Sequence, residues 1–492
     1  MATQQTPAPD GQSDAPAGGG LRRELHFWET IAISIAIMAP TAAMALNGTA
    51  PAGLIGRAVP LAFIFATIGV MLVSYAFIRL SRYFSHAGSV YALSGVTLGP
   101  RAGFFAGWAL LGTYLCFTVA STAEAGTFGV AFFKEANIIP SIDYVVVALV
   151  AAALAAVLAF GDIRVATRSL LGMEGISVTL IIILMIVIVV NLAGGTSPHG
   201  QKFTLDAFSI PGGVSLSAVA SASVFGFLSF AGFEGAASLG EESTNPRRDI
   251  PRAIRGAVLG AGIFYILCIL VQTWGFGANA AGAKTFSSST SPLGDLARSY
   301  VGKGMSEAID IGATVSAFAS GLGAAVAGAR ILFALSRDTS LGRVLGRAST
   351  RTGAPAGALT VVLLIGVGTI VLQRIAGVNA VNAFFYPGTI GVLSLIVAYM
   401  LTNIGAIRHL FIKARRAPIW EIILPILGIA VLAYTLYKNV QGVPFPYNRF
   451  PFWVAGWLVI GLAIVLFWPG LSQRIGTSLA REASAGEPPA EI

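Results

Sequence analysis

One carboxylate lies in the middle of a long apolar stretch and is flanked by glycines. Glu234 falls in the segment 223–254, which begins as an apolar helix, loosens at Gly232 and Gly235 and ends in a charged turn. A carboxylate at the centre of a membrane-length segment is costly, so it is a functional candidate by default. Flanking glycines allow a helix to break around a bound ligand. The alternative is a glutamate that is only hydrogen-bonded inside a helix bundle.

The composition indicates the kind of helices that hold this carboxylate. Hydrophobic residues make up 55% of the 492 residues and charged residues 11%, whereas ordinary soluble domains are about 25% charged. The apolar residues fall in blocks of about 20, the length that crosses a bilayer as a helix. We therefore expect an all-α membrane protein with many spans, and we exclude an ordinary soluble protein.

The net charge of +9 does not indicate a nucleic-acid partner. Most of the 31 lysines and arginines lie in short loops between apolar blocks, where they are better explained by orientation in the lipid bilayer. The partners we expect are this bilayer, with its anionic headgroups, and a small molecule. Cys116 and Cys268 both lie within apolar blocks, which favours packing over a disulfide or a metal site.

The apolar blocks predict twelve transmembrane helices. The first six are expected at 27–47, 58–80, 101–132, 143–160, 165–193 and 215–240. The second six are expected at 252–277, 305–336, 356–374, 380–403, 419–438 and 451–469. The loops richest in lysine and arginine lie on one side of this arrangement, which predicts a multi-pass protein of the cytoplasmic membrane with both termini in the cytoplasm.

Four regions follow from this pattern. Residues 1–26 and 471–492 are rich in small and polar residues and are expected to form disordered cytoplasmic tails. Residues 27–404 form the ten-helix core, and 405–470 hold two additional helices. The segment 81–100 is too short and too polar to span, so we expect a surface or re-entrant helix there. His86 lies in this segment. A single histidine in a loop is more often a solvated or capping residue than a proton relay.

The first span is also interrupted. Pro40 sits at the middle of residues 31–47, where it removes a helical hydrogen bond. A break inside the membrane persists where the freed backbone groups face protein or a watery cavity. If the first ten spans form two halves of five, the first and sixth spans correspond. Breaks at matching positions indicate a central binding site of a transporter, although a simple proline kink would also explain the first one.

Several segments together resemble the amino acid–polyamine–organocation (APC) superfamily, of the amino acid permease type. The segments that carry the resemblance, in chain order, are Ser81-Arg-Tyr-Phe-Ser-His-Ala-Gly-Ser-Val-Tyr91, Gly107-Trp108, Glu241-Glu-Ser-Thr-Asn-Pro-Arg-Arg-Asp-Ile-Pro-Arg-Ala-Ile254, Gly328-Ala-Arg-Ile-Leu-Phe-Ala-Leu-Ser-Arg-Asp338 and Asn403-Ile-Gly-Ala-Ile-Arg408. With the sixth span, they extend over the first ten spans in the right order. The combination is specific to the family but not to a substrate.

The resemblance implies a LeuT-like fold, with a 5+5 inverted repeat and broken helices 1 and 6. Substrate would bind at mid-membrane between the two breaks. By position, the family's contacts in the first span transfer to Ala39, Pro40 and Thr41. Those in the sixth transfer to Leu228, Ser229, Ala231 and Gly232, while Phe230 and Phe233 either gate the site or pack. Glu234 matches an acidic position linked to proton sensing in some members.

The sequence departs from the family at the first break. Many amino acid permeases have a glycine-rich break there, whose free N–H groups hold the substrate carboxylate. Pro40 has no N–H to donate, although Thr41 offers a hydroxyl group and the half-helix end still favours an anion. An amine or polyamine with its ammonium group near Glu234 is therefore an alternative to an amino acid.

The coupling ion is the second open point. Some sodium-independent members have a lysine in the fifth span, but no lysine or arginine occurs here between Arg168 and Lys202. A buried carboxyl group can carry a proton, so Glu234 and Glu174 are the proton-coupling candidates. Ser316 and Ser320 in the eighth span leave sodium open. Glu124 is a third intramembrane acid, to which we assign no role.

No motif indicates an enzyme or a cofactor. Gly321–Gly328 lacks the strand and lysine of a phosphate-binding loop, and the four histidines are too scattered for a metal site. The sequence therefore predicts a secondary active transporter that imports amino acids by proton symport with alternating access. The alternatives are an amine permease, an amino acid exchanger, a passive channel or a sensor; the oligomeric state is undetermined.

Overall fold

The computed structural model describes residues 26–84, 89–160, 163–239, 243–338, 355–441 and 443–468, with short pieces at 345, 470 and 473–476. These residues form helices and connecting loops without a β-strand. The helices of the first half are α1 (Phe27–Met38), α2 (Pro40–Leu46), α3 (Thr49–Ile55), α4 (Val59–Leu80), α5 (Ser89–Leu98), α6 (Pro100–Glu135), α7 (Tyr144–Phe160) and α8 (Ile163–Gly194). The all-α prediction is confirmed over this part of the chain.

The second half follows the same pattern of long helices and short connecting ones. They are α9 (Leu216–Phe230), the 3-10 helix η3 (Phe233–Leu239), α10 (Pro246–Phe276), α11 (Ala280–Ser288), α12 (Pro292–Tyr300), α13 (Lys303–Asp338), α14 (Ala356–Ile375), α15 (Ala380–Ile407), α16 (Ile423–Val440) and α17 (Phe450–Phe467). Prolines stand in the first turns of α4, α6 and α10, where the missing N–H costs no helical hydrogen bond.

Ten of the helical segments described are long and apolar enough to cross a membrane. The fourth and sixth predicted spans fall instead on the shorter apolar helices α7 and α9, of 17 and 15 residues. The chain is therefore a multi-pass membrane protein, while the count of twelve, the inverted repeat, the membrane orientation and the division into regions stay predictions. The predicted tails lie largely, and His86 wholly, outside the described residues.

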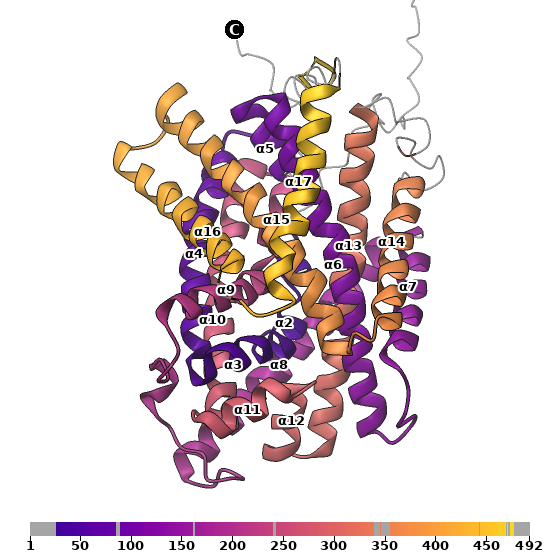
Figure 1. The fold of residues 1–492 in the computed structure, drawn as a ribbon, viewed down its shortest axis with the longest axis vertical. Helices are drawn as coiled ribbons and strands as arrows, with labels where there is room; N and C mark the ends of the chain where they lie inside the picture. The colour runs from indigo at the N-terminus through magenta and orange to yellow at the C-terminus, as the bar shows by residue number, and fades with distance from the viewer. Residues whose placement is uncertain are drawn as a thin grey trace, which may run out of the picture.

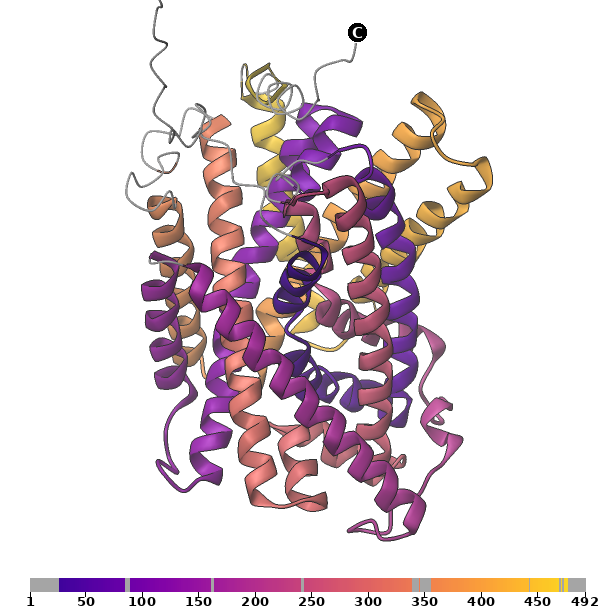
Figure 2. The same cartoon turned by 180° about the vertical axis from the view of Figure 1, so that it is seen from behind.

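The helices form one bundle around α6, which packs most extensively against α13 and α15 (Figure 1). One end of the bundle carries α5, and the other carries α3, α11 and α12 (Figure 1). Figure 2 shows α8 running diagonally across the bundle in front of the interrupted first helix, and α8 contacts both α1 and α2. The predicted surface or re-entrant segment contains α5, whose residues Ser89–Gly95 are buried against α6 and α15. All residues of α2 are buried in this arrangement.

A pair of tryptophans joins α17 to α6. The rings of Trp108 and Trp457 stack 4.4 Å apart at 14°. Each indole N–H donates to the other residue's backbone carbonyl, at 2.8 Å from Trp108 and 3.0 Å from Trp457. A Cβ at Gly461 would collide with the Trp108 ring. Glycine is therefore required there for the two helices to approach closely.

We expect Gly461→Ala to lower stability by about 1–3 kcal/mol, because the added methyl group overpacks the tryptophan pair. Gly456→Ala is the matched control on the same helix, since a Cβ there meets nothing within 4 Å. The measurement is the apparent Tm of both purified variants in detergent. Equal Tm values for the two variants would show that the close approach at Gly461 does not matter.

Candidate functional site

The first predicted break is present between α1 and α2. Ala39 separates the two helices in the left-handed conformation, with φ 44° and ψ 63°. Its N–H still bonds to the carbonyls of Ile35 and Ala36, which closes the end of α1. Pro40 then occupies the first position of α2, where a missing N–H is tolerated and φ is already helical. The proline therefore restarts a helix rather than kinking one.

The first free N–H groups of α2 bond to side chains from distant helices. The Thr41 N–H donates to Glu174 Oε1 on α8 at 2.9 Å. The Ala42 N–H donates to Ser316 Oγ on α13 at 3.1 Å. A carboxylate at a helix N-terminus is favoured by both hydrogen bonding and the helix dipole. Glu174 thus holds the interrupted first helix against α8.

The second break lies where the sixth span was expected to loosen. α9 ends at Phe230, Ala231 and Gly232 leave the helical conformation, and η3 begins at Phe233. Gly232 has φ 103°, which favours glycine, and a Cβ there would collide with Ile37 of α1. The two interrupted helices therefore meet at their breaks.

A serine on α1 joins the two interrupted segments. The Ser34 hydroxyl donates to the Phe233 carbonyl at 3.2 Å and accepts from the Ala236 N–H at 2.9 Å. Both bonds are buried, and they satisfy backbone groups that the short helix η3 leaves free. This arrangement couples α1 to η3 as one unit.

Glu234 is enclosed by tyrosines behind the break. Its carboxylate accepts hydrogen bonds from the hydroxyl groups of Tyr399 on α15, at 2.5 Å, and Tyr114 on α6, at 3.4 Å. Its side chain is 1% exposed. Glu234 therefore joins η3 to α6 and α15 and does not line the cavity described next.

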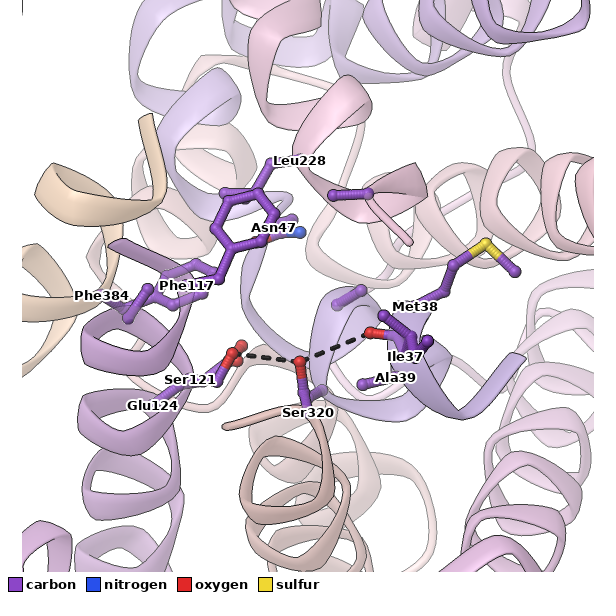
Figure 3. A pocket seen from close by; sticks show the side chains of 14 residues that line it. Ile37, Met38, Ala39, Asn47, Phe117, Ser121, Glu124, Leu228, Ser320 and Phe384 are labelled. Atoms are coloured by element: carbon purple, nitrogen blue, oxygen red, sulfur yellow. Dashed lines mark hydrogen bonds between the residues drawn. The ribbon is translucent and has the colours of Figure 1, made fainter. Parts of the chain in front are cut away.

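A small cavity of about 40 Å³ lies where the two breaks meet α6 and α13 (Figure 3). Phe117, Phe384 and Leu228 supply apolar lining. Ser121 and Ser320 share a hydrogen bond of 3.1 Å, and Ser320 also donates to the Ile37 carbonyl at 3.5 Å. The cavity thus combines an apolar part with a polar edge.

Glu124 of α6 is the carboxylate that lines this cavity. It is 3% exposed, and its Oε1 has no hydrogen-bond partner among the described residues. The side-chain oxygen of Asn47 at the end of α2, another lining residue, is also without a partner there. Buried polar atoms are almost always hydrogen-bonded, so unpartnered oxygens in a cavity indicate a ligand or water site.

The predicted substrate residues gather around the cavity. Ala39, Leu228 and Ala231 line it. The remaining six lie in the same two segments without lining it: Pro40, Thr41, Ser229, Phe230, Gly232 and Phe233. Their role as substrate contacts stays a prediction.

The two aromatic residues of the sixth span pack against other rings in this conformation. Phe230 lies edge-on to Tyr265 at 5.0 Å. Phe233 contacts Phe77 and Tyr399, with ring centroids 5.4 Å and 5.2 Å away. Both phenylalanines are fully buried. The aromatic rings at the cavity are instead those of Phe117 and Phe384, which the sequence did not distinguish from other apolar residues of their helices.

Two replacements of Glu174 distinguish the contribution of its charge from the contribution of its hydrogen bond to Thr41. We expect Glu174→Ala to destabilise the protein by about 1–3 kcal/mol, because the buried Thr41 N–H loses its partner. Glu174→Gln keeps an acceptor oxygen and should lose much less. The apparent Tm of both variants measures this difference. Indistinguishable Tm values would mean that Glu174 does not cap α2.

Comparison with known proteins identifies the family. Residues 30–482 match the sequence model of the family described as amino acid permease. The chain belongs to this family. The resemblance to the APC superfamily is thereby confirmed, and the interrupted helices belong to a permease. The family match covers most of the described helices, from within α1 to beyond α17.

Individual relatives have low sequence identity to this chain, but the similarity extends over most of their length. The permease is 26% identical over 399 residues to the branched-chain amino acid permease BcaP of Lactococcus lactis, which covers 76% of this chain and 79% of that protein. It is 25% identical over 411 residues to the low-affinity putrescine importer PlaP of Escherichia coli, covering 80% and 83%. An uncharacterized transporter of Mycobacterium tuberculosis is 26% identical over 95% of both chains.

Proposed function

We propose that this permease is a secondary active transporter of the cytoplasmic membrane that imports an amino acid or amine by proton symport. Substrate binds in the cavity between the breaks and is released by alternating access. The observation that carries the proposal is a cavity at two interrupted helices, lined by a carboxylate with an unpartnered oxygen. Interrupted helices place backbone and side-chain polar groups at mid-membrane, as a transporter requires.

An ammonium group is the part of the substrate that this cavity suits best. Amino acids and amines both carry one, and the relatives are named for branched-chain amino acids and for putrescine. In our proposal the ammonium group donates to Glu124 Oε1 and to the side-chain oxygen of Asn47. The apolar part of the substrate packs against Phe117, Phe384 and Leu228. Such charge-assisted hydrogen bonds are about twice as strong as neutral ones.

Proton coupling is proposed to use Glu234, with Glu174 as the second candidate. Each of these carboxylates connects an interrupted segment to neighbouring helices. Protonation removes the charge that strengthens these hydrogen bonds. A proton that binds to Glu234 would therefore weaken the attachment of η3 to α6 and α15. This links proton binding to movement of the segments that enclose the substrate.

Sodium coupling is the competing expectation. The two serines considered for sodium are engaged within the protein: Ser316 accepts from the Ala42 N–H, and Ser320 bonds to Ser121 and to the Ile37 carbonyl. A sodium ion would have to displace these contacts. We therefore favour protons as the coupling ion.

The test is uptake by purified protein in proteoliposomes. A labelled panel of amino acids and amines is offered with an imposed inward proton gradient, with a sodium gradient, and with neither. We expect accumulation above equilibrium only with the proton gradient. Accumulation driven by sodium would contradict proton symport, and equilibration without accumulation under every gradient would contradict active transport. Preloaded vesicles then distinguish exchange from passive flux.

A further inference from the structure

We infer that the substrate is a primary amine without an α-carboxylate. The inference rests on the proposed function and identifies the substrate class of the same cavity. It follows from one juxtaposition: the protein's own side chains accept from the free backbone N–H groups at the first break, while Glu124 and Asn47, two residues that line the cavity, each have an unpartnered side-chain oxygen. The site therefore has oxygens that can accept hydrogen bonds from a ligand, while no lysine or arginine among the residues that line it could pair with an anion.

The start of α2 has no N–H left for a substrate carboxylate. Pro40 lacks one, and those of Thr41 and Ala42 donate to Glu174 and Ser316. The next N–H, that of Ala43, donates to the carbonyl of Ala39. A substrate carboxylate at this end would have to displace Glu174, which already provides the same chemical group from within the protein.

A carboxylate of the protein also lies at the second break. Glu234 is in the first turn of η3 and accepts hydrogen bonds from the hydroxyl groups of Tyr399 and Tyr114. The Ala231 N–H donates to the Leu228 carbonyl at 3.2 Å. A substrate carboxylate at the unwound part of the sixth span would therefore be repelled by Glu234 nearby.

The serine hydroxyl groups at the cavity are hydrogen-bonded within the protein. Ser121 and Ser320 share one hydrogen bond, and Ser320 also bonds to the Ile37 carbonyl. The amide group of Asn47 donates to Ser229 Oγ at 2.7 Å, and the Ser229 hydroxyl donates to the Phe225 carbonyl at 3.1 Å. This orientation leaves the Asn47 side-chain oxygen free to accept.

Electrostatics favour the same class of ligand. Among the described residues that line the cavity, none is a lysine or arginine, and Glu124 is the charged one. A buried carboxylate is costly when unpaired, and an ammonium group supplies the missing partner. A substrate carboxylate would be a second negative charge in a site of low dielectric constant, where like charges repel strongly.

The test compares amines with the amino acids that differ only by a carboxylate. The probes are isopentylamine against leucine and putrescine against ornithine. Their kcat/KM for uptake is measured in proteoliposomes with the proton gradient that drives transport, and their affinity is measured by calorimetry in detergent. We expect the amine of at least one pair to be preferred by about tenfold or more in both assays. Preference for the amino acid in both pairs would overturn the inference and leave the proposed transport function standing.

The calorimetric binding measurement tests the substrate class independently of the proposed transport function. If neither probe of a pair is accumulated under any gradient, the proposed transport function fails, and calorimetry alone decides the substrate class. Amine binding with no amino acid binding would then still support the inference. Failure of both amines to bind, with binding of an amino acid or of neither class, would overturn it.

Variants test whether Glu124 holds the ammonium group. We expect Glu124→Gln to weaken amine binding by about 10- to 100-fold, the range of a hydrogen bond to a charged group. Glu124→Asp keeps the charge and should retain part of the affinity, so it also serves if the glutamine variant folds poorly. Glu135→Gln is the matched control on the same helix, because Glu135 pairs with Arg298 away from the cavity. Unchanged amine affinity in folded Glu124→Gln would overturn the assignment.

Discussion

Glu234→Gln is expected to abolish proton-driven accumulation of substrate while leaving exchange between loaded vesicles intact. The substitution keeps the shape of the side chain and an acceptor oxygen for Tyr399, but it removes the group that binds a proton. Exchange should survive because Glu234 does not line the cavity in which substrate is proposed to bind. The measurement is accumulation in proteoliposomes with an imposed inward proton gradient, beside counterflow in preloaded vesicles.

Two further variants test whether proton coupling depends on Glu234 itself. Glu174→Gln removes the other candidate proton site and keeps the cap on α2, so it should retain accumulation if Glu234 is the coupling residue. Tyr399→Phe removes the shorter hydrogen bond to Glu234 and leaves the carboxylate, and it should weaken coupling without abolishing it. Accumulation at the level of the unmodified protein in Glu234→Gln, combined with its loss in Glu174→Gln, would reassign proton coupling to Glu174.

Gly232→Ala is expected to prevent most of the protein from folding. Its φ of 103° is strained for any residue with a side chain, at a cost of about 1–2 kcal/mol. The added Cβ would also collide with Ile37 of α1, and overpacking adds about 1–3 kcal/mol. Losses of this size are a large part of the 5–15 kcal/mol that stabilises a typical protein. The yield of monodisperse protein in detergent should therefore fall several-fold.

The matched control is Gly260→Ala in α10. A Cβ at Gly260 meets nothing within 4 Å, and alanine is favoured over glycine in a helix interior. This variant should therefore be as stable as the parent or slightly more so. If Gly232→Ala behaves like Gly260→Ala, the close approach of the two interrupted helices does not restrict this position.

The sequence by itself indicated which segments are apolar and long enough to cross a membrane and where two of the helices are interrupted. Apolar blocks of membrane length mark the spans, and the positions of Pro40 and Gly232 mark the breaks, because proline and glycine act on the local backbone. The length of an apolar block predicts the length of the helix less well than these residues predict the breaks. The fourth and sixth predicted spans are helices of only 17 and 15 residues. The family was recognised from the sixth span together with short segments such as 81–91, 241–254 and 328–338.

Only the tertiary structure decided what each buried carboxylate contacts. In the sequence, Glu234 is the acid with a breaking helix around it, and Glu124 is one acid within a continuous helix. In the fold, Tyr399 and Tyr114 enclose Glu234, whereas Glu124 lines the cavity with an unpartnered oxygen. The two tyrosines lie 120 and 165 residues away from Glu234 in the chain. Helix periodicity is a local property and does not report which side chains meet across a bundle.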